Sequence, residues 1–160
     1  MPPRAELPPQ PLPQDKELVL KVVPMPADVN ANGDIFGGWV MAQVDLAGSV
    51  LPRRIAHGRI ATVAVKEFIF KQPVRVGDIL SFYSSVAHVG RTSITVNVEV
   101  YAEQFSDQGH YVKVTEATLT YVAIDAAGSP QALPDTEKIR LCREAAARNA
   151  SQNAAKTLNA

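Results

Sequence analysis

The stretch that decides the fold is Gly38 to Leu51, GWVMAQVDLAGSVL. Its apolar residues fall on every side of a helical wheel, which predicts a helix buried all round. Its 14 residues are too few to span a bilayer, which needs about 20. Gly37 and Gly38 are expected to begin this helix, and Pro52 to end it. We therefore expect one core helix packed on a sheet.

Five segments around this helix have the pattern of strands, being rich in β-branched residues and bounded by Pro, Gly or Asp turns. They are Glu17–Val23, Ile60–Phe70, Ile79–His88, Ile94–Tyr101 and Val112–Ile124. The second, Ile60–Phe70, has apolar residues at both odd and even positions. The two sets point to opposite faces of a strand, so we expect both of its faces to be covered. The order of one strand, one helix and four strands predicts an α+β fold, in which a five-stranded antiparallel sheet wraps around one long central helix.

The chain has 160 residues, a length that suits a single folded domain. Its 16 Lys and Arg balance its 16 Asp and Glu, so no basic field exists to attract nucleic acid. A single cysteine, Cys142, allows no disulfide within the chain. No apolar run has the length of a signal peptide or a spanning helix. We expect a cytoplasmic protein that does not insert into membranes.

The composition divides the chain into three regions. Residues 1–16 form a Pro-rich leader that we expect to be flexible. Residues 17–134 hold the helix and the strands, and so form the folded domain. In residues 135–160, Asp135-Thr136 precedes good helix formers, which predicts a capped helix that fades into a polar tail.

One acid, Asp45, stands inside the apolar helix. A carboxylate in such surroundings needs a partner, or its pKa rises. The functional interpretation is a general base or a nucleophile. The structural alternative is a side chain on a strip exposed to solvent or to a subunit interface.

The loop before the helix, Asn30 to Gly38, is rich in residues that form turns and helix caps. It has a simple interpretation as a cap and turn. It also has a chemical one, because a helix start at Gly37 and Gly38 presents free N–H groups to a developing oxyanion. Gly38 and Asp45 are seven positions apart, about 10 Å along a helix. One reacting carbon does not easily touch both, so we predict a site shared by two copies of the chain, with Asp34 or Asn32 completing its polar lining.

Two turns combine glycine with basic or hydroxyl residues: His57, Gly58 and Arg59, and Gly90, Arg91, Thr92 and Ser93. Most such turns are merely solvated, but these residues also suit a small phosphate cradle. The three histidines lack the spacing of metal ligands. We therefore expect no metal.

Three segments resemble one known family. Met25–Gly48 (MPADVNANGDIFGGWVMAQVDLAG), Ile55–Val65 (IAHGRIATVAV) and Val89–Ile94 (VGRTSI) are similar, in order and spacing, to the YciA-type acyl-CoA thioesterases of the hotdog-fold superfamily. The resemblance implies a hotdog fold, a dimer with one continuous sheet, and commonly a trimer of dimers. It also implies hydrolysis of acyl-CoA to a carboxylic acid and CoA, with CoA entering only as part of substrate and product.

The resemblance also assigns roles to residues. Asp45 matches the catalytic acid, Asp34 stands where relatives carry Asn or Asp, and Gly37-Gly38 match the helix start that faces the thioester carbonyl. We expect Asn30, Asn32 and Phe36 to bind substrate, and the two turns resemble the regions that hold CoA phosphates.

Two other functions remain open. A hotdog hydratase or dehydratase would pair a histidine with an acid, and no histidine falls between Asn30 and Leu51. An acyl-CoA-binding sensor or carrier would use the same groove without turnover.

Overall fold

The computed structural model of the chain describes residues 8–158. Its elements in order are β1 (Glu17–Val22), the short 3₁₀ helix η1 (Pro26–Asp28), α1 (Gly37–Ala56), β2 (Arg59–Phe70), β3 (Ile79–Val89), β4 (Ser93–Glu103), β5 (Tyr111–Ile124) and α2 (Glu137–Leu158). The first seven residues of the expected leader lie outside the described residues. Its remainder, residues 8–16, has no helix or strand, and the N–H of Gln10 donates to the carbonyl of Tyr111.

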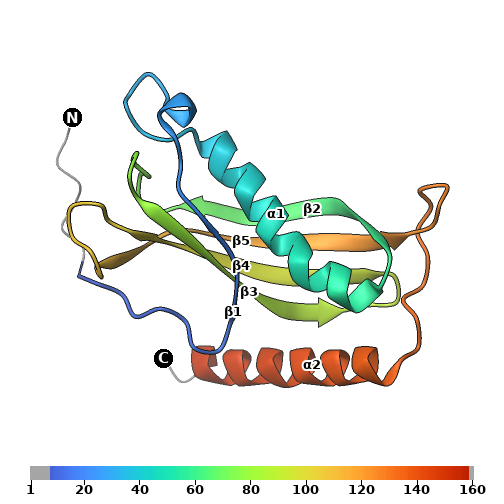
Figure 1. Ribbon diagram of the computed structural model, residues 1–160. Helices are drawn as coiled ribbons and strands as arrows, with labels where there is room; N and C mark the ends of the chain where they lie inside the picture. The colour runs from blue at the N-terminus through green and yellow to red at the C-terminus, as the bar shows by residue number, and fades with distance from the viewer. Residues whose placement is uncertain (1–7, 159–160) are drawn as a thin grey trace.

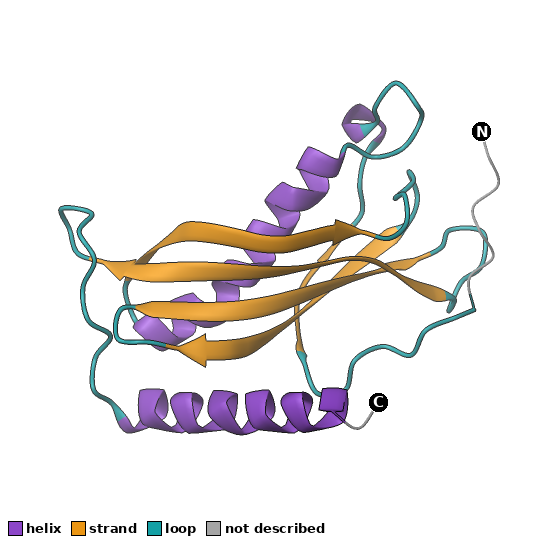
Figure 2. Cartoon of the chain, turned by 180° about the vertical axis from the view of Figure 1, so that it is seen from behind, coloured by secondary structure: helices purple, strands orange, loops and turns teal. Residues whose placement is uncertain are grey.

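The five strands form one antiparallel sheet in the order β1-β3-β4-β5-β2. α1 crosses one face of this sheet, as Figure 1 shows, and Figure 2 shows the opposite face with α1 behind the strands. The hydrophobic core fills the space between α1 and the sheet. Valine is its most frequent residue, and its large side chains include Leu80, Phe82, Leu119 and Tyr121. The α+β fold with a five-stranded sheet and a long helix is therefore confirmed.

The prediction that Pro52 ends the helix is wrong. Pro52 lies inside α1 and is buried, so packing against the sheet holds a last turn that proline alone would weaken. The helix ends at Ala56, and the capping residue His57 adopts a left-handed φ of 51° and donates its N–H to the carbonyl of Arg53.

The prediction that this helix is buried all round is also wrong for the single chain. Val40, Val44 and Ala47 are buried against the sheet, but Met41 and Leu46 are 43% and 59% exposed. One sheet covers only one face of a helix, so the outer face of α1 remains free.

β2 differs from its prediction in the same way. It is an edge strand beyond β5, and Val63, Val65 and Ile69 are about half exposed rather than covered on both faces. Its register against β5 shifts twice, between Thr62 and Ala64 and between Lys66 and Ile69. Within the second shift Glu67 takes a left-handed φ of 53°, which marks a β-bulge.

The C-terminal helix extends farther than predicted. Thr136 caps it, because its hydroxyl accepts from the N–H of Ile139, but α2 continues through the polar residues to Leu158. Ile139 and Ala146 are buried where α2 packs beside β3, so docking stabilises a helix of modest intrinsic strength. Neither helix in the described part of the chain has the length and apolar character needed to traverse a bilayer.

Candidate active site

The Asp45 carboxylate is half-buried at the middle of α1 and meets two hydroxyl groups from the sheet. The Thr62 hydroxyl on β2 donates to Asp45 Oδ1 at 2.8 Å. The Tyr121 hydroxyl on β5 lies 3.1 Å from the same oxygen and 2.8 Å from the Asp45 carbonyl. Three elements therefore fix this carboxylate, and both contacts use Oδ1. Asp45 Oδ2 carries no hydrogen bond within residues 8–158.

Toward Asp45, the Tyr121 hydroxyl serves as a hydrogen-bond donor. Burial, together with the neighbouring Asp45 carboxylate, raises the pKa of the Tyr121 hydroxyl far above its ordinary value of 10.0. The phenol therefore stays protonated. It reaches the helix through a gap at Gly48, where a β-carbon would stand 2.5 Å from the Tyr121 hydroxyl oxygen.

The start of α1 is open. Phe36 occupies the N-cap position without a side-chain cap, so the cap in the cap-and-turn interpretation is not formed by a side chain. A β-carbon on Gly38 would meet nothing within 4 Å, whereas one on Gly37 would stand 3.2 Å from the Phe70 ring. The helix therefore presents its first N–H groups and the positive end of its dipole at an accessible position.

The loop before α1 is a turn built on Asn30, as the simpler interpretation expected. Asn30 Oδ1 accepts from the N–H groups of Asn32 and Asp34, and Gly33 has a φ of 85°. Asp34 Oδ1 is buried and lies 3.9 Å from Nε of Arg75. The turn therefore holds Asp34 toward Arg75, while Asn32 and Phe36 remain exposed.

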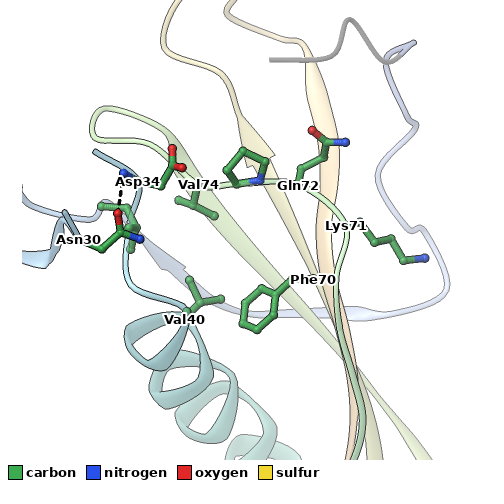
Figure 3. A pocket seen from close by; sticks show the side chains of 10 residues that line it. Asn30, Asp34, Val40, Phe70, Lys71, Gln72 and Val74 are labelled. Atoms are coloured by element: carbon green, nitrogen blue, oxygen red, sulfur yellow. Dashed lines mark hydrogen bonds between the residues drawn. The ribbon is translucent and has the colours of Figure 1, made fainter. Parts of the chain in front are cut away.

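A cleft of about 320 Å³ lies between this loop, the start of α1 and the end of β2 (Figure 3). Val40 and Phe70 form part of its apolar wall, and the Asn30 amide lies at its polar side. The full lining consists of Asn30, Asp34, Ile35, Gly37, Val40, Phe70, Lys71, Gln72, Pro73 and Val74. The structure thus brings together three sequence-predicted site residues, Asn30, Asp34 and Gly37, around one cavity.

The two glycine-containing turns lie at the other end of the molecule. α1 has 20 residues, which makes it about 30 Å long, and His57 to Arg59 follow its far end. Both turns flank the end of β5, because Arg59 pairs with Ile124 and the Thr92 carbonyl accepts from Ala123. The Arg59 guanidinium donates to the carbonyls of Asp125 and Ala126. Within one chain these turns and the cleft are therefore far apart, with Asp45 between them.

Thr62, Tyr121 and Gly48 were not predicted from the sequence. For Tyr121 a signal exists, because it lies in the inward row of β5 between Leu119 and Ala123, and a buried tyrosine hydroxyl needs a partner.

The geometry has the parts that acyl-group hydrolysis requires: a positioned carboxylate, an open helix start and an apolar cleft beside that helix start.

Comparison with known proteins agrees with this chemistry. The thioesterase superfamily matches residues 32–105. The acyl-CoA thioester hydrolase YciA of Escherichia coli is 48% identical over 120 residues, which cover 74% of this chain and 91% of that protein.

Two solved structures share the fold. A hexameric hotdog-fold thioesterase of Campylobacter jejuni aligns with a TM-score of 0.73 at 39% identity, covering 80% of this chain and 96% of that one. HI0827, a hexameric broad-specificity acyl-coenzyme A thioesterase, aligns with a TM-score of 0.76 at 40% identity, covering 88% of this chain and 95% of that one. The chain therefore belongs to the YciA family of acyl-CoA thioester hydrolases, within the thioesterase superfamily.

Proposed function

We propose that the protein hydrolyses acyl-CoA at a site formed by two copies of the chain. Water, activated by Asp45, attacks the thioester carbonyl carbon while the N–H groups at Gly37-Gly38 of the other copy polarise the carbonyl oxygen. The carbon–sulfur bond then breaks, and the proton taken from water passes to the CoA thiolate. The products are a carboxylic acid and CoA. No further cofactor is required, because a thioester is already a good electrophile.

The observation that carries this proposal is the fixed Asp45 carboxylate. Thr62 and Tyr121 both bind Oδ1, which leaves Oδ2 to accept a proton from water. An aspartate whose only task was solubility would not need hydroxyl groups from two different strands. The helix start lies seven residues away, about 10 Å along the axis, so the oxyanion site and the base come from different protomers.

The exposed edge of β2 explains how a second copy supplies the missing half. β2 runs back along the sheet from the end of α1 to its start, and its apolar side chains Val63 and Val65 are exposed. An antiparallel pairing of two such edges would continue the sheet and place the two α1 helices in opposite directions. The Gly37-Gly38 end of one helix would then face the half of its neighbour that carries Asp45. We assign the assembly as a trimer of dimers, in line with the hexameric relatives.

The acyl group and the CoA phosphates of the substrate occupy different regions of the molecule. The acyl group enters the cleft at Val40, Phe70 and Val74, with Asn30, Asn32, Asp34 and Phe36 along its approach. The CoA phosphates bind to the two glycine-containing turns, which lie at the end of the molecule away from the cleft. These turns comprise His57, Gly58 and Arg59, and Gly90, Arg91, Thr92 and Ser93. An apolar cleft discriminates weakly between chain lengths, so we expect a broad range of acyl groups, as in the broad-specificity relative.

The experiment is release of free CoA from short, medium and long acyl-CoAs, followed with a thiol-reactive dye. The parent protein should release CoA, and Asp45→Asn should abolish release while the oligomer persists. Glu144→Gln, which alters an exposed carboxylate on α2, is the matched control and should keep full activity. Binding of acyl-CoA without release by the parent protein would overturn the hydrolase and favour a sensor or carrier. Full release by Asp45→Asn would keep the activity but remove this mechanism.

A further inference from the structure

The turn from Gly90 to Ser93 between β3 and β4 is held by donors from outside it. Arg143 Nη2 on α2 donates to the Gly90 carbonyl at 2.9 Å. The N–H of Leu133 donates to the Arg91 carbonyl at 2.8 Å, and the N–H of Ala123 donates to the Thr92 carbonyl at 2.9 Å. Three consecutive carbonyls are therefore occupied by the C-terminal part of the chain.

This anchoring decides where the amide groups of the turn point. In a trans peptide the carbonyl of one residue and the N–H of the next point in opposite directions, and the described chain has no cis peptide bond. The N–H groups of Arg91 and Thr92 therefore point away from the anchoring donors, and neither makes a hydrogen bond within residues 8–158. Successive outward-facing N–H groups in a turn can bind an anion, and Thr92 and Ser93 carry hydroxyl groups in the same turn.

Arg143 is itself held in place. Its helix is anchored by the buried side chain of Ile139, which is 0% exposed, and by Lys138, whose amino group donates to the Arg54 carbonyl at 3.2 Å. Arg143 is half-buried, whereas Arg148 on the same helix is exposed and pairs with Glu144 at 3.9 Å. The Arg143 contact is thus a fixed link between α2 and the turn.

We infer that Arg143 is a positioning residue for the phosphate-bearing end of the substrate. It holds the Gly90 carbonyl inward, which turns the following N–H group outward for a phosphate oxygen of CoA, and it adds a positive charge behind the turn. This inference rests on the proposed acyl-CoA hydrolysis. It gives α2, which lies apart from Asp45 and the cleft, a part in substrate binding.

The test compares two substrates with the same acyl group, one an acyl-CoA and the other an acyl-pantetheine thioester that lacks the nucleotide. For Arg143→Gln we expect KM for acyl-CoA to rise about tenfold with kcat unchanged, because a hydrogen bond from a charged donor is lost. The acyl-pantetheine kinetics should not change. Arg148→Gln is the matched control and should resemble the parent protein with both substrates.

Arg143→Lys retains the charge and should restore part of the affinity for acyl-CoA. It also supplies the same two-substrate comparison if Arg143→Gln does not fold. Equal losses with the two substrates, or no loss with either, would overturn the role of Arg143. Failure of the parent protein to hydrolyse either substrate would instead refute the proposed function.

Discussion

The Tyr121 hydroxyl oxygen lies 2.5 Å from the position that a β-carbon on Gly48 would occupy. The absence of a side chain on α1 at this point is what allows a sheet residue to contact the Asp45 carboxylate and carbonyl. The two residues are 73 positions apart in the sequence. Glycine is unfavourable inside a helix by about 1 kcal/mol relative to alanine. The contact between Tyr121 and Asp45 therefore comes at a cost in the helix propensity of α1.

Gly48→Ala should therefore destabilise the protein although alanine favours helices. Overpacking costs about 1–3 kcal/mol, and a contact as short as 2.5 Å should put the cost above the gain in helix propensity of about 1 kcal/mol. Urea denaturation measures the difference. Gly38→Ala is the control for stability, because a β-carbon there meets nothing within 4 Å, and it should be neutral or slightly stabilising. Equal effects of the two substitutions would contradict the steric argument.

Tyr121→Phe removes the hydroxyl but keeps the ring. We expect a loss of about 1 kcal/mol of stability and a fall in kcat of about tenfold, because Asp45 is less well positioned. The double variant with Gly48→Ala provides a sharper measurement. The clashing atom is then absent, so Gly48→Ala should cost less stability in the Tyr121→Phe background than in the parent. Strict additivity of the two changes would show that Gly48 acts elsewhere.

The shared site predicts complementation between two inactive variants. Asp45→Asn removes the base, and Gly37→Pro removes an N–H at a helix position where proline is tolerated. A refolded equimolar mixture should recover about a quarter of the parent activity, since half of the dimers are mixed and each mixed dimer has one intact site. CoA release by the mixture, compared with each variant alone, measures this recovery. A mixture without activity would place both groups in the same chain.

We predict that the protein loses stability in acid, because the Glu116 carboxylate on β5 is stabilised in its ionised form. Hydrogen bonds from Lys113 and Lys71 lower the pKa of Glu116 below its ordinary value of 4.5. Because the folded-state pKa is the lower one, the ionised carboxylate stabilises the fold above about pH 4.5, and this stabilisation disappears as the pH falls through the folded-state pKa.

Urea midpoints measured between pH 7 and pH 3 test this prediction. The decline should be shallower in Glu116→Gln than in the parent protein. Glu144→Gln removes a carboxylate that pairs with the exposed Arg148 at 3.9 Å, and this variant should follow the parent curve. A parent-like slope in Glu116→Gln would remove Glu116 as a source of the acid sensitivity.

Much of the fold could be predicted because its signals are local. Alternating β-branched residues mark β4 and β5, and the glycine pair marks the start of α1. Pro52 misled the prediction because the packing of Ile55 and Ala56 extends the helix past a residue that usually ends one. The exposed faces of α1 and β2 could not be foreseen either. Apolar side chains on all sides of an element indicate that it is covered, but they do not show whether this chain or another copy covers it.

The site was predictable in part for the same reason. Asp45, Asn30 and the glycine pair stand out in a short segment, and the structure places Asn30 and Gly37 at one cleft. The partners of Asp45 come from Thr62 and Tyr121, which are 17 and 76 residues away. Such contacts depend on strand register, and the shift between Thr62 and Ala64 is not visible in a residue pattern.

The bulge at Glu67 also bears on how far the sheet can grow. A sheet with two open edges is a template for endless addition of strands. Here one edge, β1, has only six residues, and the other bends where Glu67 adopts a left-handed φ. The register shifts between Thr62 and Ala64 and between Lys66 and Ile69 leave only short stretches of β2 that can accept a neighbouring strand in regular register. The protein can therefore join one copy of itself at this edge without polymerising into fibres.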